Sequence, residues 1–276
     1  MPADKKIRVT ISPRIIELIE KEAAFYEMTR NRLCNLIFEG HRTDEYCQHS
    51  SCSKKKVIQF NLSVENIKHY ESIMNANGVT NESEFFRGLF EGYERLSYAA
   101  RQIEIFKKLY NELEMAVEKR KIIKIEYGEE VIEIEPYFIT SDVRESDNYL
   151  FGYSLSNCEY AVFKLRKIKG VMFTGKNFAA RNEEYVKSVA KNFDPYLSHG
   201  HVVKLRLVGL GLETLENFDL IMPKLLERDG DVLKFECSQR YAEIFFSPFM
   251  DRIEIIEPES LRDRFREKLT AAAGLY

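Results

Sequence analysis

One lysine in the second half of the chain stands in an apolar pattern, where a charge needs a chemical reason. Phe163, Leu165 and Lys167 are two residues apart, so a regular strand places their side chains on one face. Burying an ammonium group is costly unless it meets a counter-ion or an anionic ligand. We therefore predict an anion-binding surface on this strand. The alternative is a bulge at Ile168 that turns Lys167 toward solvent.

Motifs of known catalytic centres are missing from the sequence. We find no nucleophile elbow, no phosphate-binding loop, no metal-ligand helix and no paired acid and base. Gly209-Leu210-Gly211 follows a predicted strand, but Thr214 stands where a dinucleotide fingerprint has its third glycine. His199-Gly200-His201 has no further ligands nearby and is expected to be an exposed turn. We predict that the protein is not an enzyme and needs neither a cofactor nor a metal.

A polar segment at residues 41–53 contains two histidines and two cysteines, namely His41, Cys47, His49 and Cys52. A zinc quartet is one interpretation, but the spacing is irregular and lacks a paired C-x-x-C, so a flexible loop is favoured. The basic run 54–56 follows it. This run either contacts phosphate or blunts the edge of the next strand with charge.

Composition narrows the class of protein. The 276 residues suggest two or three domains, and 45% hydrophobic with 31% charged residues is an ordinary globular balance. A net charge of −3 excludes a general polyanion-binding surface, so any nucleic-acid site must be a local patch. Five scattered cysteines indicate a reducing compartment rather than a disulfide scaffold. Without a long apolar stretch or a signal-peptide pattern, we expect a cytoplasmic protein with no membrane partner.

The first third of the chain is an internal repeat. Residues 6–11 and 57–62 both alternate apolar and polar side chains, as a strand with one buried face does. Each strand is followed by two amphipathic helices, of which the first begins at Ser12 or Ser63 and the second near Thr29 or Asn81. The residues predicted to point outward from the two strands are Lys6, Arg8, Thr10, Gln59 and Asn61.

This strand-helix-helix order, present twice over about residues 5–97, resembles the ribbon-helix-helix family of nucleic-acid-binding proteins. The resemblance implies an antiparallel ribbon over four helices, whose outward Lys6, Arg8, Thr10, Gln59 and Asn61 contact nucleic acid. It also makes the starts of the two second helices candidate phosphate anchors. Residues 1–102 have a net charge of only +1, and Glu82 would repel a phosphate, so dimerisation or docking is the open alternative.

A helix from Ile103 to Val117 and about five short strands follow, which is typical of a small barrel. This region resembles the WYL domain, an Sm-like barrel. The segments that carry the resemblance are Ile125-Glu126-Tyr127, Glu135-Pro136-Tyr137, Tyr149-Leu150, residues 163–168 and residues 174–178. Asn148 stands where the family has its tryptophan, and Lys164 and Lys167 stand where it has arginines.

The WYL resemblance implies a surface that senses ligands such as nucleotides or nucleic acids. The candidate residues are Tyr149, Tyr153, Lys164, Arg166 and Lys167. Tyrosines beside cations suit base stacking combined with phosphate contact. The alternative is that both tyrosines are ordinary core or rim aromatics of the barrel.

The last part of the chain resembles the C-terminal extension of WYL proteins, most clearly over residues 247–261. We expect strands near 202–208, 232–237 and 253–256, and a helix over 212–226 that Pro223 kinks or ends. The fold class predicted for the whole chain is α+β: tandem ribbon-helix-helix at 1–98, a WYL barrel at 99–180, and a ferredoxin-like extension at 181–276. The resemblance also implies a homodimer formed through the C-terminal region.

Together these parts resemble the WYL-type accessory proteins of type VI-D CRISPR systems, which modulate an RNA-guided RNA nuclease in antiviral defence. The resemblance implies that single-stranded RNA is the ligand and that the nuclease is a partner. The alternative is a transcription regulator that reads duplex DNA through the ribbon and a ligand through the barrel.

Overall fold

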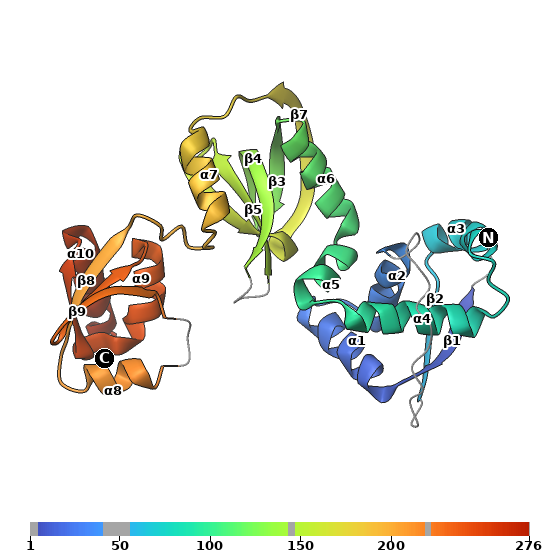
Figure 1. The fold of residues 1–276 in the computed structure, drawn as a ribbon, viewed down its shortest axis with the longest axis horizontal. Helices are drawn as coiled ribbons and strands as arrows, with labels where there is room; N and C mark the ends of the chain where they lie inside the picture. The colour runs from blue at the N-terminus through green and yellow to red at the C-terminus, as the bar shows by residue number, and fades with distance from the viewer. Residues whose placement is uncertain (1–4, 41–55, 143–146, 219–221, 276) are drawn as a thin grey trace. The chain divides into compact units, whose positions relative to one another are not determined.

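A computed structural model describes residues 5–40, 56–142, 147–218 and 222–275 (Figure 1). It is a mixed α+β structure with antiparallel sheets, as the sequence predicts. The chain divides into two compact units. The first contains most of residues 1–178, and the second contains residues 179–276 with short pieces of the preceding segments.

The first unit begins with two strand-helix-helix copies. The first copy is β1 (Lys6–Ile11), α1 (Pro13–Phe25) and α2 (Arg30–Gly40), and the second is β2 (Lys56–Asn61), α3 (Val64–Ala76) and α4 (Glu82–Arg95). Ser12 and Ser63 cap α1 and α3 through their hydroxyl oxygens. The strands β1 and β2 pair antiparallel, with Arg8 opposite Gln59, and their inward side chains share one core with the helices.

In both copies, the second helix donates the same kind of hydrogen bond to the two-stranded ribbon formed by β1 and β2. Asn35 Nδ2 donates a hydrogen bond to the Asn61 carbonyl at 2.9 Å, and Arg87 Nε donates one to the Thr10 carbonyl at 3.0 Å. The two donors are separated by about one repeat length, and so are the two acceptors. Each second helix therefore fixes the strand of the other copy, and the sequence repeat is also a structural repeat.

Two helices replace the single helix predicted from Ile103 to Val117. Helix α5 (Tyr98–Ile105) is capped by Ser97, and α6 (Lys107–Glu118) begins after Phe106 without a side-chain cap. Phe106 has φ −105° and ψ 25°, which breaks the helical path. Buried hydrogen bonds of Gln102 join α5 to the sheet that follows, whereas α6 begins beyond the break.

A five-stranded antiparallel sheet follows. Its strands are β3 (Lys121–Tyr127), β4 (Glu130–Asp142), β5 (Asp147–Ser154), β6 (Glu159–Lys164) and β7 (Ile168–Asn177), in the order β6-β5-β4-β3-β7. The closed barrel that we predicted is wrong for the described residues, where β6 and β7 remain edges. A one-turn 3-10 helix, η1 (Leu165–Lys167), interrupts the extended backbone between these two strands.

The second unit combines helices with a four-stranded sheet. Its helices are α7 (Glu183–Lys191), α8 (Gly211–Glu216), α9 (Gln239–Phe246) and α10 (Glu259–Ala273), with a 3-10 segment, η2 (Ser247–Arg252). The strands are β8 (Val202–Leu207), β9 (Lys224–Asp229), β10 (Val232–Glu236) and β11 (Ile253–Glu257), in the order β11-β8-β10-β9. Their inward side chains form a second core with α9 and α10.

The predicted helix over 212–226 is shorter than expected. It ends at Glu216, and Lys224–Asp229 is a strand that pairs with β10. Proline cannot donate a backbone hydrogen bond within a helix, and Gly230, with φ 60°, closes the tight turn between β9 and β10. Pairing with β10 therefore makes residues 224–229 a strand instead of the end of a helix.

Several sequence features lie outside the described residues or away from the candidate interface. The zinc candidates His41, Cys47, His49 and Cys52 are outside the described residues, as are two of the three lysines at 54–56. Of the cysteines that the structure describes, Cys34, Cys158 and Cys237 are free, and burial raises the pKa of the Cys34 and Cys237 thiols to about 12. Within the described ranges, no helix is long and apolar enough to cross a bilayer.

Candidate nucleic-acid interface

A buried carboxylate brings two of the predicted cations together. Asp147, at the start of β5, has a side chain that is only 6% exposed. Its Oδ2 atom lies 3.2 Å from Lys164 Nζ and 3.2 Å from Arg166 Nε. Two cations this close repel each other, so the shared carboxylate is what allows them to remain adjacent. Asp147, Lys164 and Arg166 therefore form one charged cluster.

The two cations also remain accessible. The side chain of Lys164 is 30% exposed and that of Arg166 is 27% exposed, whereas the carboxylate between them is buried. An anion from solvent can therefore reach the cations without displacing Asp147. The cluster has the charge and the geometry to bind a phosphate group through charge-assisted hydrogen bonds.

A buried polar network holds Asp147 in place. Gln102 of α5 is fully buried, and its Nε2 atom donates a hydrogen bond to Asp147 Oδ1 at 2.7 Å. The backbone N–H and Nδ2 of Asn148 donate to Gln102 Oε1 at 2.9 and 2.8 Å, and Asn148 Nδ2 also donates to the Ala99 carbonyl. Asn148, where the WYL resemblance expects tryptophan, thus joins β5 to α5 by hydrogen bonds. A satisfied network of this kind rigidifies its surroundings.

The two predicted tyrosines occupy different places. Tyr149 is 1% exposed, and the centre of its ring lies 5.5 Å from Lys164 Nζ. Its burial leaves no ring face for a base, so Tyr149 supports Lys164 from inside. Tyr153 lies four residues farther along β5, at a strand rise that corresponds to about 13 Å, and is half-buried. The structure therefore places Tyr153 outside the Asp147 cluster.

Lys167 does not lie on the buried face of a strand, and that prediction is wrong. The 3-10 turn of η1 interrupts the alternation, so Leu165 is buried while Lys167 is exposed. The irregularity that we considered as the alternative is therefore present, as a turn rather than a bulge. It is Arg166 whose guanidinium reaches Asp147.

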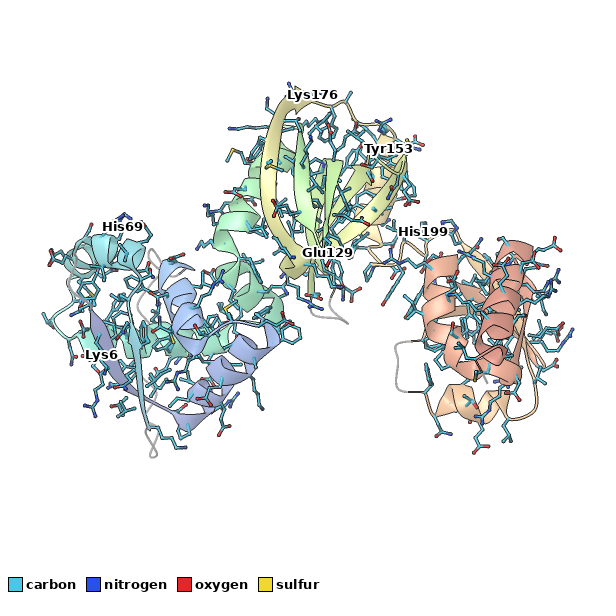
Figure 2. The ribbon with its side chains drawn as sticks, turned by 180° about the vertical axis from the view of Figure 1, so that it is seen from behind. Lys6, His69, Glu129, Tyr153, Lys176 and His199 are labelled. Carbon is cyan, nitrogen blue, oxygen red and sulfur yellow. The ribbon has the colours of Figure 1, made fainter. Side chains whose placement is uncertain are left out.

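The predicted ribbon residues share one surface. Lys6, Arg8, Gln59 and Asn61 are exposed, and Thr10 is half-buried, on the face opposite the core. Figure 2 shows Lys6 on the ribbon and Tyr153 on the five-stranded sheet. The two groups of candidate residues therefore belong to different parts of the first unit, and the structure does not bring them together.

The two candidate phosphate anchors differ from each other. Glu82 stands in the first turn of α4, with Lys5 Nζ 2.6 Å from its carboxylate, and Tyr70 donates a hydrogen bond to it. Burial, with Glu82 as the next cause, raises the pKa of Tyr70. The start of α4 thus already holds an internal carboxylate. At the corresponding start of α2, Thr29 Oγ1 accepts a hydrogen bond from the Arg32 N–H at 3.2 Å.

One aromatic residue beside the Asp147 cluster was not among the site residues predicted from the sequence. Phe25, the last residue of α1, lies with its ring centre 5.0 Å from the guanidinium carbon of Arg166. The sequence contains a weak signal for it, because Phe25 falls outside the apolar stripe that includes Ala23 and Tyr26. That pattern indicates an exposed side chain but does not predict which residues lie next to it.

Comparisons with known proteins include a structural likeness that covers the whole chain. No protein-family model matches the chain, and no curated protein matches it. A solved structure described as a crystal structure of a CRISPR Cas-related protein matches with a TM-score of 0.67 and 13% identity, over 100% of this chain and 95% of the other. Proteasome accessory factor B/C (PafBC) of Arthrobacter aurescens matches with a TM-score of 0.30 and 17% identity, and the chain spans 50% of that protein. The first likeness shows a shared fold.

Proposed function

We propose that this chain is a non-enzymatic regulatory protein that binds single-stranded RNA and modulates a type VI-D CRISPR RNA-guided RNA nuclease. The observation that carries the proposal is the pair of cations, Lys164 and Arg166, held on the buried carboxylate of Asp147. The fold shared with a CRISPR Cas-related protein supports the CRISPR setting. The proposal includes the three parts inferred from the sequence: a ribbon-helix-helix repeat, a WYL domain with an open sheet, and a ferredoxin-like extension.

The charge pair is suited to the backbone of a nucleic acid. Both nitrogen atoms lie 3.2 Å from one oxygen, so they are no farther apart than twice that distance and can contact the same phosphate. Backbone contacts do not distinguish sequences, so we expect binding to RNA of many sequences with strong dependence on salt.

The small number of cations on the β1–β2 ribbon supports single-stranded RNA, rather than duplex DNA, as the proposed ligand. Affinity for duplex DNA depends on the number of phosphates that cations neutralise. The outward face of the ribbon has two cations at its predicted contact positions, Lys6 and Arg8. At α4, the internal carboxylate of Glu82 opposes a phosphate anchor. A symmetric operator would need equivalent anchors in both copies.

Binding of fluorescently labelled single-stranded RNA and palindromic duplex DNA, measured by anisotropy across a salt series, tests the proposed ligand. We expect tighter binding of RNA than of duplex DNA, both by the wild type and by the Arg8→Ala, Asn61→Ala double variant. A preference for duplex DNA that this variant abolishes would establish the rival function, a DNA-reading transcription regulator.

The partner and the absence of catalysis need separate measurements. Cleavage of target RNA by a type VI-D nuclease with its guide should proceed at a different rate when the protein is added. Labelled RNA incubated with the protein alone should remain intact. An unchanged nuclease rate would refute the proposed partner, and cleavage by the protein alone would refute its non-enzymatic role. Light scattering at micromolar concentration tests the expected homodimer.

A further inference from the structure

An exposed phenylalanine from the N-terminal repeat lies against the cation pair of the sheet. Phe25 is 51% exposed at the end of α1, and its ring centre is 5.0 Å from the Arg166 guanidinium carbon. Arg166 Nε is in turn 3.2 Å from Asp147 Oδ2. Both Phe25 and Arg166 belong to the first compact unit, so α1 and the η1 turn contribute to one surface.

Two tyrosine rings contact the ring of Phe25 in edge-to-face arrangements. Tyr26 lies 5.0 Å away at an interplanar angle of 82°, and Tyr98 lies 6.1 Å away at 76°, both edge-to-face contacts. Tyr26, the next residue, packs against the core of the repeat. Phe25 is therefore held in position by aromatic and cation–π contacts while half of its surface stays in water.

We propose that Phe25 stacks on an unpaired base of the nucleic acid whose phosphate is held by Lys164 and Arg166. This inference rests on the proposed function and adds a base-binding residue to it. Arg166 contacts both Phe25 and Asp147, so the base site and the phosphate site lie within one side-chain length. Stacking on an aromatic ring accepts any base, but it requires that the base be unpaired. The composite site therefore selects single strands without reading their sequence.

The chain has no tryptophan, so the substitution Phe25→Trp introduces a single indole reporter that can still stack. Two probes are compared: an oligouridylate, and an abasic sugar–phosphate oligomer of equal length and charge. We expect the oligouridylate to quench the indole fluorescence of this variant and the abasic oligomer to leave it unchanged. Because an indole stacks at least as well as a phenyl ring, the variant should bind oligouridylate with wild-type affinity or better.

Removal of the ring gives the second readout. Phe25→Ala should weaken oligouridylate binding by about tenfold, the size of one lost aromatic–base stack, and leave the affinity for the abasic oligomer unchanged. The matched control is Phe173→Ala, which removes a ring that is 44% exposed on β7 of the same unit. This control should bind both probes as the wild type does.

The possible results separate the two proposals. If the wild type binds oligouridylate and Phe25→Ala binds it equally well, the stacking role is wrong while the proposed RNA binding stands. If Phe25→Ala weakens both probes equally, the ring only supports Arg166 and the inference is again overturned. If the wild type binds neither probe, the proposed function itself fails.

Discussion

Asp147 Oδ2 and Arg166 Nε are 3.2 Å apart, and this contact joins the start of β5 to the η1 turn. The same carboxylate oxygen lies 3.2 Å from Lys164 Nζ, and its other oxygen accepts a hydrogen bond from Gln102 of α5. The Arg166 guanidinium also lies over the ring of Phe25 in α1. The buried carboxylate is therefore the centre from which the candidate interface is organised.

We predict that Asp147→Asn weakens oligouridylate binding. The substitution keeps the shape of the side chain but removes the charge that holds Lys164 and Arg166 together, so the two cations separate. The expected loss is roughly tenfold, the size of one charge-assisted hydrogen bond. Anisotropy titrations measure it, and Asp147→Glu should recover part of the affinity. Tighter binding by Asp147→Asn would mean that the carboxylate competes with phosphate instead of positioning its ligands.

The hydrogen bonds of Gln102 are expected to stabilise the junction between α5 and β5. Gln102→Met retains the size of the side chain but leaves polar groups of Asp147 and Asn148 without their buried partner. We expect a decrease of about 2–4 kcal/mol in the free energy of unfolding, since unsatisfied buried groups cost roughly 1–3 kcal/mol each and are not additive. Urea denaturation provides the measurement.

The control for that substitution is Gln59→Met, on the exposed face of the ribbon. A surface change of this kind should alter the free energy of unfolding by less than about 0.5 kcal/mol. Equal stabilities for the Gln102 and Gln59 variants would show that the buried network contributes little.

In the second unit, we expect Glu236 to make stability depend on acidity. Burial alone would raise its pKa, but hydrogen bonds from the Gly200 N–H and Lys224 Nζ, both at 3.3 Å, outweigh burial and lower the pKa from 4.5. A lowered folded-state pKa stabilises the fold above the unfolded-state pKa, and this contribution is lost as the pH falls through the folded-state value.

Glu236→Gln removes that contribution. We expect the melting temperature of the wild type to fall more than that of the variant between about pH 6 and about pH 3, a range that spans the usual carboxyl pKa. Parallel melting curves for the two proteins over this range would contradict the role given to Glu236.

Local patterns in the sequence were sufficient to predict the two strands of the ribbon and their exposed face. Alternation in two strands one repeat apart predicted which side chains face outward, because the period of a strand fixes its faces. Arg8 and Gln59 accordingly lie opposite each other on the exposed face. Helix caps such as Ser12 and Ser63 were predictable for the same reason, since capping depends on a few adjacent residues.

The sheet cluster depends on tertiary contacts that no local pattern encodes. The η1 turn contains neither glycine nor proline, so alternation from Phe163 predicted an anion contact for Lys167. The contact with Asp147 is made by Arg166, which was a candidate only through the WYL resemblance. Asp147 and Gln102 are 45 residues apart and meet only because α5 docks on β5. Closure of the sheet into a barrel depends on strand curvature and pairing, which strand-length patterns do not fix.

The most direct test of the account is the salt dependence of oligouridylate binding by the Lys164→Ala, Arg166→Ala double variant. Its matched control is Lys167→Ala, Lys169→Ala, which removes the same charge from two exposed lysines of the same segment. We predict at least a tenfold loss of affinity for the first variant, with a salt slope smaller by about 0.7, as expected for one lost phosphate contact on a single strand. The control variant should lose little affinity for oligouridylate. Equal affinities and equal slopes for the two variants would contradict the claim that the cation pair on Asp147 binds the RNA backbone.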